Sequence, residues 1–216
     1  MSSLATLLVL ADGRLPAGGH AHSGGFEAAV SAGRVGDLPG LEGFLRGRLH
    51  TSGVVAAAFA AAACTAAATR LADLNEGLDA RTPSPALRRA SRAQGRALLR
   101  AGRAMWSFEQ HARDPHHPVA LGVVAAAAGL GPVEAATAAA HGTVTGPASA
   151  AVRLLGLDPY ATHALIAALA PDCDRIAARA AAVAGAPVDD LPADGAPLLD
   201  IGAEHHASWE VRLFAS

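Results

Sequence analysis

The sequence predicts an all-α protein, a single-domain helical bundle with a partly extended C-terminal tail. Hydrophobic residues make up 51% of the 216 residues but aromatic residues only 4%, so alanine, leucine and valine supply most of the apolar surface. Alanine has the highest helix propensity of all residues. Apolar side chains recur at helical spacing, and Asp37, Ser84 and Asp158 precede first-turn prolines as N-caps do. No stretch alternates between polar and apolar residues as a half-buried strand would.

The N-terminal half contains the signals for three helices and a long alanine run. We expect the first helix at Leu4–Ala11, and we expect it to be buried because it is apolar on every side. A short helix follows over Gly25–Ala32. Asp37 is the expected N-cap of the next helix, with Pro39 tolerated in its first turn. Gly53 is expected to bend or break that helix before the alanine run.

The C-terminal half contains longer helices interrupted by prolines. We expect these helices to begin at Ser84, near Val119, at Pro132 and at Asp158, the last running to about Ala184. Proline removes a backbone donor and clashes with the preceding turn. Gly146 and Pro147 are therefore expected to interrupt the third of these helices, and Pro171 to kink or split the fourth.

The chain is expected to divide into an all-helical domain, residues 1–184, and a linker with a C-terminal partner-docking tail, residues 185–216. From Gly185 to Ala203 the sequence is dominated by Pro, Gly, Asp and Ala, which predicts an extended linker. Trp209 and Phe214 lie in the last eight residues, and such large side chains must be buried somewhere. Two alternatives remain open: the tail docks on its own body or on another protein.

The composition excludes several classes of function. A formal net charge of −2 argues against a general nucleic-acid-binding protein. All basic residues are arginine, so neither a lysine-dependent phosphate loop nor Schiff-base chemistry is available. Cys64 and Cys173 lack metal-site spacing and are interpreted as small buried hydrophobic residues. The longest apolar run, Val54–Ala68, is too short to cross a bilayer. We expect a cytoplasmic protein without a membrane or nucleic-acid partner.

The stretch Leu15–Val30 holds the least common residues of the chain. Two glycine pairs, Gly18-Gly19 and Gly24-Gly25, flank two histidines and a serine, namely His20, His22 and Ser23. Glycine gives up more conformational freedom on folding than other residues, so two pairs in eight residues indicate a shaped loop. Pro16 ends the preceding helix, and Glu27 suits the first turn of the next one. The alternative is a buried glycine elbow between packed helices.

A row of arginines lies on one face of the helix that begins at Ser84. Its members are Arg88, Arg92, Arg96, Arg100 and Arg103, spaced by four, four, four and three residues. A row of this kind is usually a solvated face. The alternative is a docking surface for an acidic partner, because arginine forms bidentate pairs with carboxylates.

Histidines provide the only candidates for a reaction centre. His20 and His22 could form half of a metal site, and Asp114–His117 is a second histidine-bearing turn. The remaining histidines are scattered, and neither a nucleophile elbow nor a dinucleotide fingerprint is present. We therefore expect no catalytic residue, no metal ligand and no cofactor. The rival interpretation is a small helical metal-dependent hydrolase that uses His20, His22 and this turn.

Several motifs resemble those of the UreF family of urease accessory proteins. The family has an N-terminal Leu-Pro-x-Gly-Gly-aromatic-x-x-Ser-x-Gly-Leu-Glu motif and ends in Arg-Leu-Phe-x-Ser. The matching residues here are Leu15, Pro16, Gly18, Gly19, Ser23, Gly25, Glu27, Arg212, Leu213, Phe214 and Ser216. The resemblance extends to Arg89–Arg96, His117-Pro118, Arg153-Leu154 and Pro197–Ile201. The chain departs from the family pattern at His20, at Phe26 and at Ala207.

The resemblance implies a non-enzymatic, dimeric protein that binds the accessory protein UreD, also called UreH. Together these would recruit the nickel-carrying GTPase UreG to the urease apoprotein for nickel insertion. A direct nickel carrier is a third interpretation, for which the ten histidines are poorly clustered. We expect the partner-binding residues to be Pro16, Gly18, Gly19, His20, His22, Ser23, Gly25, Glu27, Arg92, Arg96, Trp209, Arg212, Leu213 and Phe214.

Overall fold

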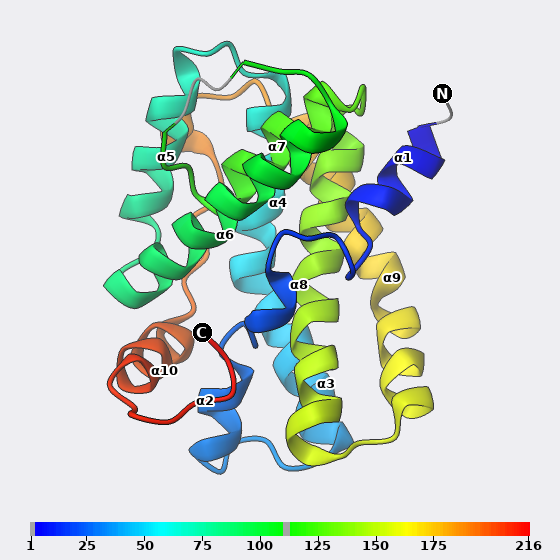
Figure 1. The fold of residues 1–216 in the computed structure, drawn as a ribbon, viewed down its shortest axis with the longest axis vertical. Coiled ribbons are helices and arrows are strands. Elements are labelled where there is room, and N and C mark those ends of the chain that lie inside the picture. Colours follow the sequence, from blue (N-terminus) through cyan, green and yellow to red (C-terminus); the bar gives the residue numbers. More distant parts are fainter. Residues whose placement is uncertain (1–2, 110–112) are drawn as a thin grey trace.

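The computed structural model describes residues 3–109 and 113–216, and the prediction of an all-α fold is confirmed within those ranges (Figure 1). The described residues contain no strand and form one compact domain. The α-helices are α1 (Ser3–Leu10), α2 (Phe26–Ser31), α3 (Leu38–Arg48), α4 (Val54–Thr65), α5 (Arg70–Ala80), α6 (Pro85–Met105), α7 (His117–Ala127), α8 (Pro132–Leu155), α9 (Pro159–Ala182) and α10 (Pro197–Ala207). Among them, no helix has both the length and the apolar character that a bilayer crossing requires.

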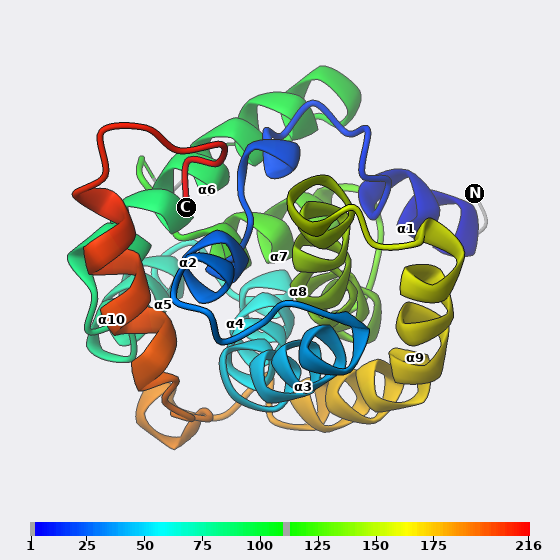
Figure 2. The ribbon, with the colours of Figure 1, turned by 90° about the horizontal axis from the view of Figure 1, so that it is seen from below.

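Helix α4 forms the centre of the bundle and packs against α7, α8 and α9 (Figures 1 and 2). Its alanines are almost completely buried, from Ala57 to Ala63. Such small side chains allow very close approach of the neighbouring helices. A Cβ atom placed on Gly122 of α7 would lie only 2.3 Å from the carbonyl oxygen of Ala60. The core therefore gains stability from close helix contacts rather than from large side chains.

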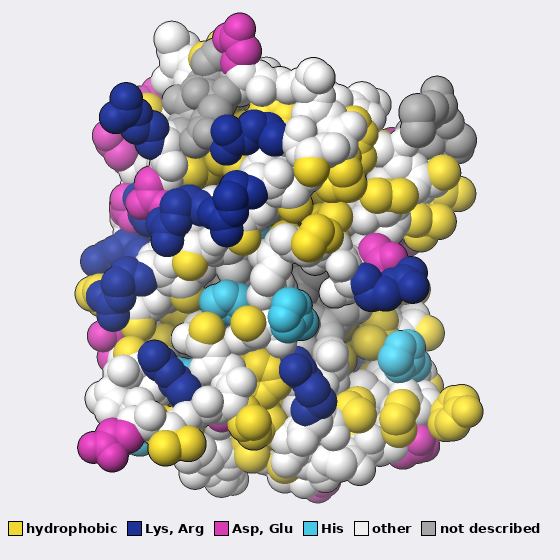
Figure 3. Space-filling view, in the orientation of Figure 1, with side chains coloured by type: hydrophobic (Ala, Val, Ile, Leu, Met, Phe, Trp, Pro, Cys, Tyr) yellow, Lys and Arg dark blue, Asp and Glu magenta, His cyan; other side chains and the backbone are white. Residues whose placement is uncertain are grey.

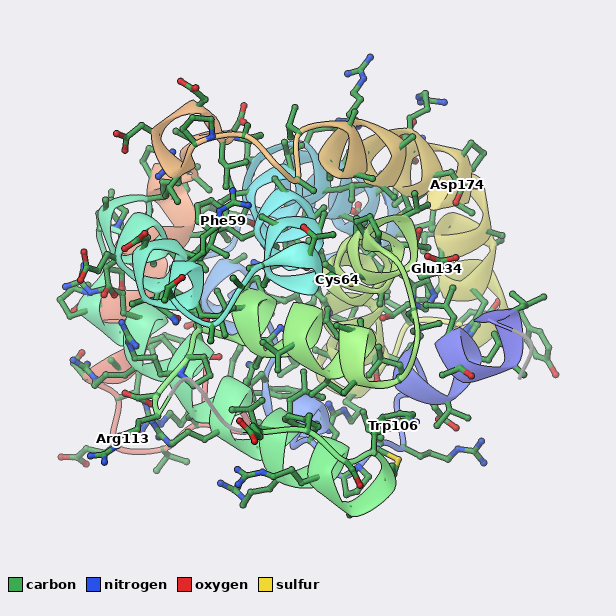
Figure 4. All side chains as sticks on the ribbon, turned by 90° about the horizontal axis from the view of Figure 1, so that it is seen from above. Phe59, Cys64, Trp106, Arg113, Glu134 and Asp174 are labelled. Carbon is green, nitrogen blue, oxygen red and sulfur yellow. The ribbon has the colours of Figure 1, made fainter. Side chains whose placement is uncertain are left out.

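The two cysteines are free thiols, of which Cys173 is buried in the core and Cys64 is partly buried against it. Cys64, at the end of α4, donates a hydrogen bond to the Leu130 carbonyl oxygen at 3.4 Å (Figure 4). Burial and the nearby Glu134 raise the pKa of the Cys64 thiol to about 11. Cys173 is 5% exposed, and burial also raises its pKa. Both thiols are therefore protonated at neutral pH. The interpretation as a small buried hydrophobic residue is confirmed for Cys173, whereas Cys64 is half-buried.

The prediction that the first helix is buried is wrong. Leu4 and Leu8 of α1 are 63% and 64% exposed, and Val9 is 48% exposed. Helix α1 lies at the periphery of the bundle in both ribbon views (Figures 1 and 2). An amphipathic pattern would have distinguished a buried face from an exposed one, but this helix is apolar all round.

Of the two alternatives at Gly53, the structure excludes a break in the helix. A five-residue π-helical segment, Leu49–Gly53, joins α3 to α4 without leaving helical geometry. A Cβ atom on Gly53 would lie 3.2 Å from Thr143 Cγ2, so the glycine allows this joint to approach α8. The π-helical turn is the kind of local irregularity that bends a helix without ending it.

Neither interior proline ends its helix, contrary to the interruption expected at Pro147 and the split considered at Pro171. Helix α8 continues through Pro147, and α9 continues through Pro171. Pro147 is buried among packed helices, and this tertiary packing outweighs its local cost of roughly 3 kcal/mol. Figure 2 shows α9 changing direction between its first and second halves, in accord with the alternative of a kink.

The extended linker expected over Gly185–Ala203 is also wrong. The segment forms a short 3₁₀ turn at Val188–Asp190 and then enters α10 at Pro197. Arg81, which caps the C-terminal end of α5, fixes it by donating hydrogen bonds to four backbone carbonyl groups, those of Val188, Asp189, Leu191 and Pro192. Arg81 also lies 5.2 Å from the ring centre of Phe59 in α4 (Figure 4). Tertiary hydrogen bonds therefore order a segment whose composition predicts flexibility.

Substitution of Gly122 by alanine should destabilise the fold by about 1–3 kcal/mol, because the added Cβ would meet the backbone of α4 and cannot be accommodated by a rotamer change. Gly47→Ala is the matched control. Gly47 lies in α3, and a methyl group added there would meet nothing within 4 Å beyond its own turn of helix. Alanine at this position should therefore be neutral or stabilise by roughly 0.5–1 kcal/mol. Urea denaturation followed by circular dichroism measures both. Equal stability of the two variants would contradict close packing at the α4–α7 crossing.

Candidate interaction site at the glycine loop and the tail

The loop between α1 and α2 is shaped by its glycines. Gly18, Gly24 and Gly25 have φ values of +75°, +63° and +89°, a region that side-chain-bearing residues rarely adopt. Gly19 differs from them, because its φ is negative and it begins a short 3₁₀ segment, Gly19–Ala21. Space around Gly19 is open, so neither conformation nor packing requires glycine there. Three of the four glycines therefore have backbone conformations that require glycine and that determine the shape of the loop.

The C-terminal tail returns to this loop, and the two predicted interaction elements form one structure (Figures 1 and 2). The Ala215 amide donates to the Ala21 carbonyl oxygen at 2.7 Å. The amide and hydroxyl of Ser23 donate to the Ser216 carbonyl oxygen at 2.6 and 2.8 Å. The Ser23 hydroxyl also accepts from the Glu27 amide at 3.2 Å, in the first turn of α2, whose N-cap is Gly25. Ser23 is fully buried by these contacts.

Glu27 in the first turn of α2 is the centre of this arrangement. Its carboxylate accepts hydrogen bonds from the Leu213 amide at 2.8 Å and the Phe214 amide at 3.1 Å. His206 of α10 lies 2.7 Å away through Nε2. Glu27 is only 7% exposed, so it is a buried junction of α2, α10 and the tail. The sequence indicates only that Glu27 lies near the positive end of α2. The structure shows in addition that it joins α2 to α10 and to the tail.

Hydrogen bonding keeps the Glu27 carboxylate charged despite its burial. Burial alone would raise its pKa. The hydrogen bonds from His206 and from the amides of Leu213 and Phe214 act in the opposite direction and outweigh burial, so the pKa of Glu27 lies below its ordinary value. The charged form is therefore the form that holds the tail.

Phe214 anchors the tail in the core of its own chain. It is 3% exposed, and the guanidinium of Arg153 lies 4.4 Å from its ring centre. The same arginine donates to the His20 carbonyl oxygen at 2.9 Å and so connects α8 to the glycine loop. Of the two alternatives for the tail, docking on its own body is the one that the structure shows for Phe214. Sequence reasoning did not place Arg153 in this site, although the family motif includes it.

The tail presents a second set of side chains to solvent. Val211 and Leu213 are 88% and 76% exposed, and Arg212 between them is also exposed. Leu198 and Ile201 of α10 add further exposed apolar surface, at 64% and 63%. Trp209 is half-buried against the rings of His205 and His206. The tail thus attaches through Phe214 while its neighbouring side chains remain accessible.

Among the described residues, the two loop histidines do not belong to a three-residue group placed to hold a metal ion, although His117 is near enough to His22 for the two imidazoles to interact electrostatically. His20 is exposed, and the His22 Nδ1 atom lies 2.7 Å from the Ser216 hydroxyl. His116, from the second histidine turn, instead bonds through its two ring nitrogens to Ser91 and Asp79, at 3.0 and 2.9 Å. Throughout the described residues, no group of three or more His, Cys, Asp or Glu side chains is arranged to hold a metal ion.

The arginine face of α6 is partly engaged within the chain. Arg92 donates to Asp79 at 2.6 Å and also reaches the backbone of Asp114, while Arg96 pairs with the Asp114 carboxylate. Both arginines remain predicted partner contacts, but each already has an acidic partner in its own chain. Figure 3 shows basic side chains and histidine side chains on the same face of the molecule.

The predicted contact residues fall into an exposed and a buried group. Pro16, Gly19, His20, Arg96, Arg212 and Leu213 are exposed, and Gly18, His22, Gly25, Arg92 and Trp209 are partly buried. Ser23, Glu27 and Phe214 are buried within the chain itself. These three act by holding the loop and the tail together, so any partner would contact the residues around them.

Comparison with known proteins identifies relatives that span the whole chain. A family model described as UreF matches residues 35–170. A protein named "Urease accessory protein UreF" from Mycobacterium sp. (strain JLS) is 49% identical over 220 residues, covering 100% of both chains. Proteins of the same name from Mycolicibacterium vanbaalenii and Mycobacterium tuberculosis are 48% and 43% identical, also over the full length of both chains.

Substitution of Glu27 by glutamine should release the tail. Glutamine has one oxygen to accept from the two tail amides, and its NH₂ group would face donors, at a cost of about 1–3 kcal/mol in the free energy of unfolding. Hydrogen exchange at the Leu213 and Phe214 amides should accelerate. Glu42→Gln is the control, because Glu42 forms only an exposed pair with Arg46. Unchanged exchange in Glu27→Gln would contradict the central role of this carboxylate.

The same interaction predicts a pH dependence with a definite sign. Because the pKa of Glu27 is lower in the folded chain than its ordinary value of 4.5, its contribution to stability is fully present above pH 4.5. The contribution is lost as the pH falls through the lower, folded-state value. Protection of the tail amides should therefore decrease on acidification in the natural protein and be less sensitive to acid in Glu27→Gln.

Proposed function

This chain belongs to the UreF family of urease accessory proteins, and we propose that it serves as a non-catalytic scaffold in urease maturation. In this proposal it binds UreD (UreH), acts as a homodimer in the complex, and recruits the nickel-carrying GTPase UreG to the urease apoprotein. Nickel is then the cargo of the assembly. The scaffold would also influence GTP hydrolysis by UreG, and the complex would form in the cytoplasm.

The observation that supports this proposal is the composite surface made by the glycine loop and the tail. Hydrogen bonds on the inner side of the tail hold it in one conformation, and apolar side chains on its outer side face solvent. Exposed apolar residues beside an arginine are typical of protein-binding surfaces. A surface that is already ordered loses little conformational entropy on binding. These are properties of a docking platform, and they require no reaction centre.

Removal of the exposed apolar side chains of the tail should weaken partner binding without unfolding the chain. In Val211→Ser with Leu213→Ser, both residues are more than three-quarters exposed, so the melting temperature should change little. Burial of such side chains at an interface contributes roughly 1.5–3 kcal/mol each, so affinity for UreD should fall about 10-fold or more. Titration calorimetry with purified UreD measures this change.

A matched control is Leu4→Ser with Leu8→Ser, which removes two leucines of α1 that are 63% and 64% exposed. This control should retain UreD binding if the tail is the specific contact. Equal losses in both double variants would indicate that any exposed apolar surface suffices. Full retention of binding in the tail variant would disprove the assignment of the tail as the UreD contact.

The two loop histidines distinguish a protein contact from a nickel path. His20→Phe introduces the aromatic residue typical of the family, and His22→Asn retains polar atoms near the Ser216 hydroxyl. We expect urease activation in cells to survive the double substitution, because the proposed role of the loop is to contact a protein. Urease activity at low and high nickel concentrations is the measurement. A loss of activation that added nickel reverses would show instead that the imidazoles carry nickel.

A further inference from the structure

A cavity of about 770 Å³ lies between the glycine loop, the π-helical joint and helices α6 to α9. Figure 3 shows the molecule hollowed beside the histidine side chains near the middle of this face. Unlike the alanine core, the wall of the cavity carries polar groups. These include Arg48, Thr162 and the imidazoles of His22, His117 and His141. The cavity extends beyond the tail-docking site, because its wall includes Arg48 and Thr162 as well as Arg153 and His22, which contact the tail.

Arg48 in this wall has no partner for its positive charge among residues 3–109 and 113–216. No hydrogen bond or ion pair to its guanidinium is found among the described residues, and its Nε atom is buried without an acceptor. The contrast with Arg46 is direct, because Arg46 pairs with both Glu42 and Asp172. A Cβ atom on Gly24 would lie 3.1 Å from the Arg48 Cζ atom, so the head group packs against the glycine loop. It is therefore held at the cavity wall, where its Nε atom is buried while the residue as a whole is partly exposed.

The surroundings of Arg48 do not neutralise it. Burial lowers its pKa to about 10, which still leaves it charged at neutral pH. Burial lowers the pKa of His117 to about 4 and also lowers that of His141, so these imidazoles are neutral. Of the acidic side chains on the cavity wall, Asp12 is paired with Arg14 and Asp200 accepts from the Ser84 amide. Asp194 is exposed and forms no ion pair within 4.0 Å of a described cation.

A second unsatisfied polar group lies in the same wall. Thr162 of α9 is 1% exposed, and its hydroxyl oxygen has no hydrogen-bond partner among the described residues. Buried polar groups in folded proteins are nearly always satisfied, and a buried charge requires a counter-charge. An unpaired cation and an unpaired hydroxyl in one cavity therefore indicate an occupant that is both anionic and able to accept hydrogen bonds.

We propose that this cavity binds a small oxyanion through the guanidinium of Arg48. The guanidinium offers parallel N–H donors that match a carboxylate-like or phosphate-like pair of oxygens. Neutral imidazoles and the Thr162 hydroxyl supply further donors along the wall. The occupant is a bicarbonate, a small carboxylate or inorganic phosphate, and water fills the rest of the cavity. This site is separate from the proposed docking function and does not depend on it.

Titration calorimetry on the full chain tests the proposal with sodium bicarbonate, sodium formate and sodium phosphate, each at constant ionic strength with chloride as the reference. We expect saturable binding of at least one anion and an increase in melting temperature. Binding of bicarbonate or formate alone identifies a planar ligand, and binding of phosphate alone a tetrahedral one. A natural chain that shows no saturable binding to any of the three overturns the proposal.

Variants of Arg48 connect the binding to this residue. Arg48→Met keeps the apolar stem and removes the unpaired charge, so it should fold with an unchanged or higher melting temperature and lose anion binding at least 10-fold. Arg48→Lys keeps the charge without the paired donors and should bind with intermediate affinity. Arg100→Met, at an exposed arginine of α6, should bind as the natural chain does. Equal affinity in Arg48→Met and Arg100→Met would place the anion elsewhere and overturn the proposal.

Discussion

The charged carboxylate of Glu27 is the interaction on which the functional half of this molecule depends. It receives donors from α10 and from two consecutive amides of the tail, across 179 to 187 residues of sequence. A carboxylate suits this position because it offers acceptors only, and all the neighbouring groups are donors. Its negative charge also lies in the first turn of α2, where the helix dipole favours it. One buried side chain thus determines where the loop, α10 and the tail lie.

The rest of the bundle serves as a rigid support for that junction. Few aromatic side chains are available, so the helices approach closely through alanine and glycine, as at the crossing of Gly122 with Ala60. Close packing of this kind transmits displacement rather than absorbing it. Arg81 and Arg153 add long connections, the first to the backbone before α10 and the second to the glycine loop and the ring of Phe214. These two arginines thereby fix the positions of segments that are distant in sequence, a role that large core side chains commonly have.

The features predicted correctly from the sequence are those determined within a few residues of chain. Asp37, Ser84 and Asp158 accept hydrogen bonds from backbone amides two or three residues later, so each capped helix begins where expected. The positive φ angles of Gly18 and Gly25 are likewise local. The incorrect predictions concern segments whose conformation is determined by contacts between residues that are distant in sequence. Packing carries α8 through Pro147, and hydrogen bonds from Arg81 order the segment that composition predicts to be an extended linker.

For the interaction site, the sequence indicates which residues are unusual but not which ones touch. Glu27 reads as a helix-dipole residue, and only the fold brings it to the tail amides. His206 appears in the sequence beside a departure from a family pattern, yet it contacts Glu27. Arg153 is far along the chain from its aromatic partner Phe214, and no local pattern connects the two. The sequence therefore predicts the components of this site better than their connections.

The alternation along the tail has a consequence for how a scaffold of this kind responds to a partner. Leu213 and Phe214 are neighbours in sequence, and Glu27 binds both of their amides, but one side chain faces solvent and the other faces the core. A partner that contacts Leu213 therefore acts on the same backbone that Glu27 holds. Suppose that the partner binds more tightly when the tail is attached to the body. Attachment of the tail then increases the affinity of the partner, and partner binding stabilises the attached tail by the same free energy. Partner binding at the exposed side chains and tail attachment at Glu27 are therefore thermodynamically coupled. The coupling requires both the exposed and the buried residues of the tail.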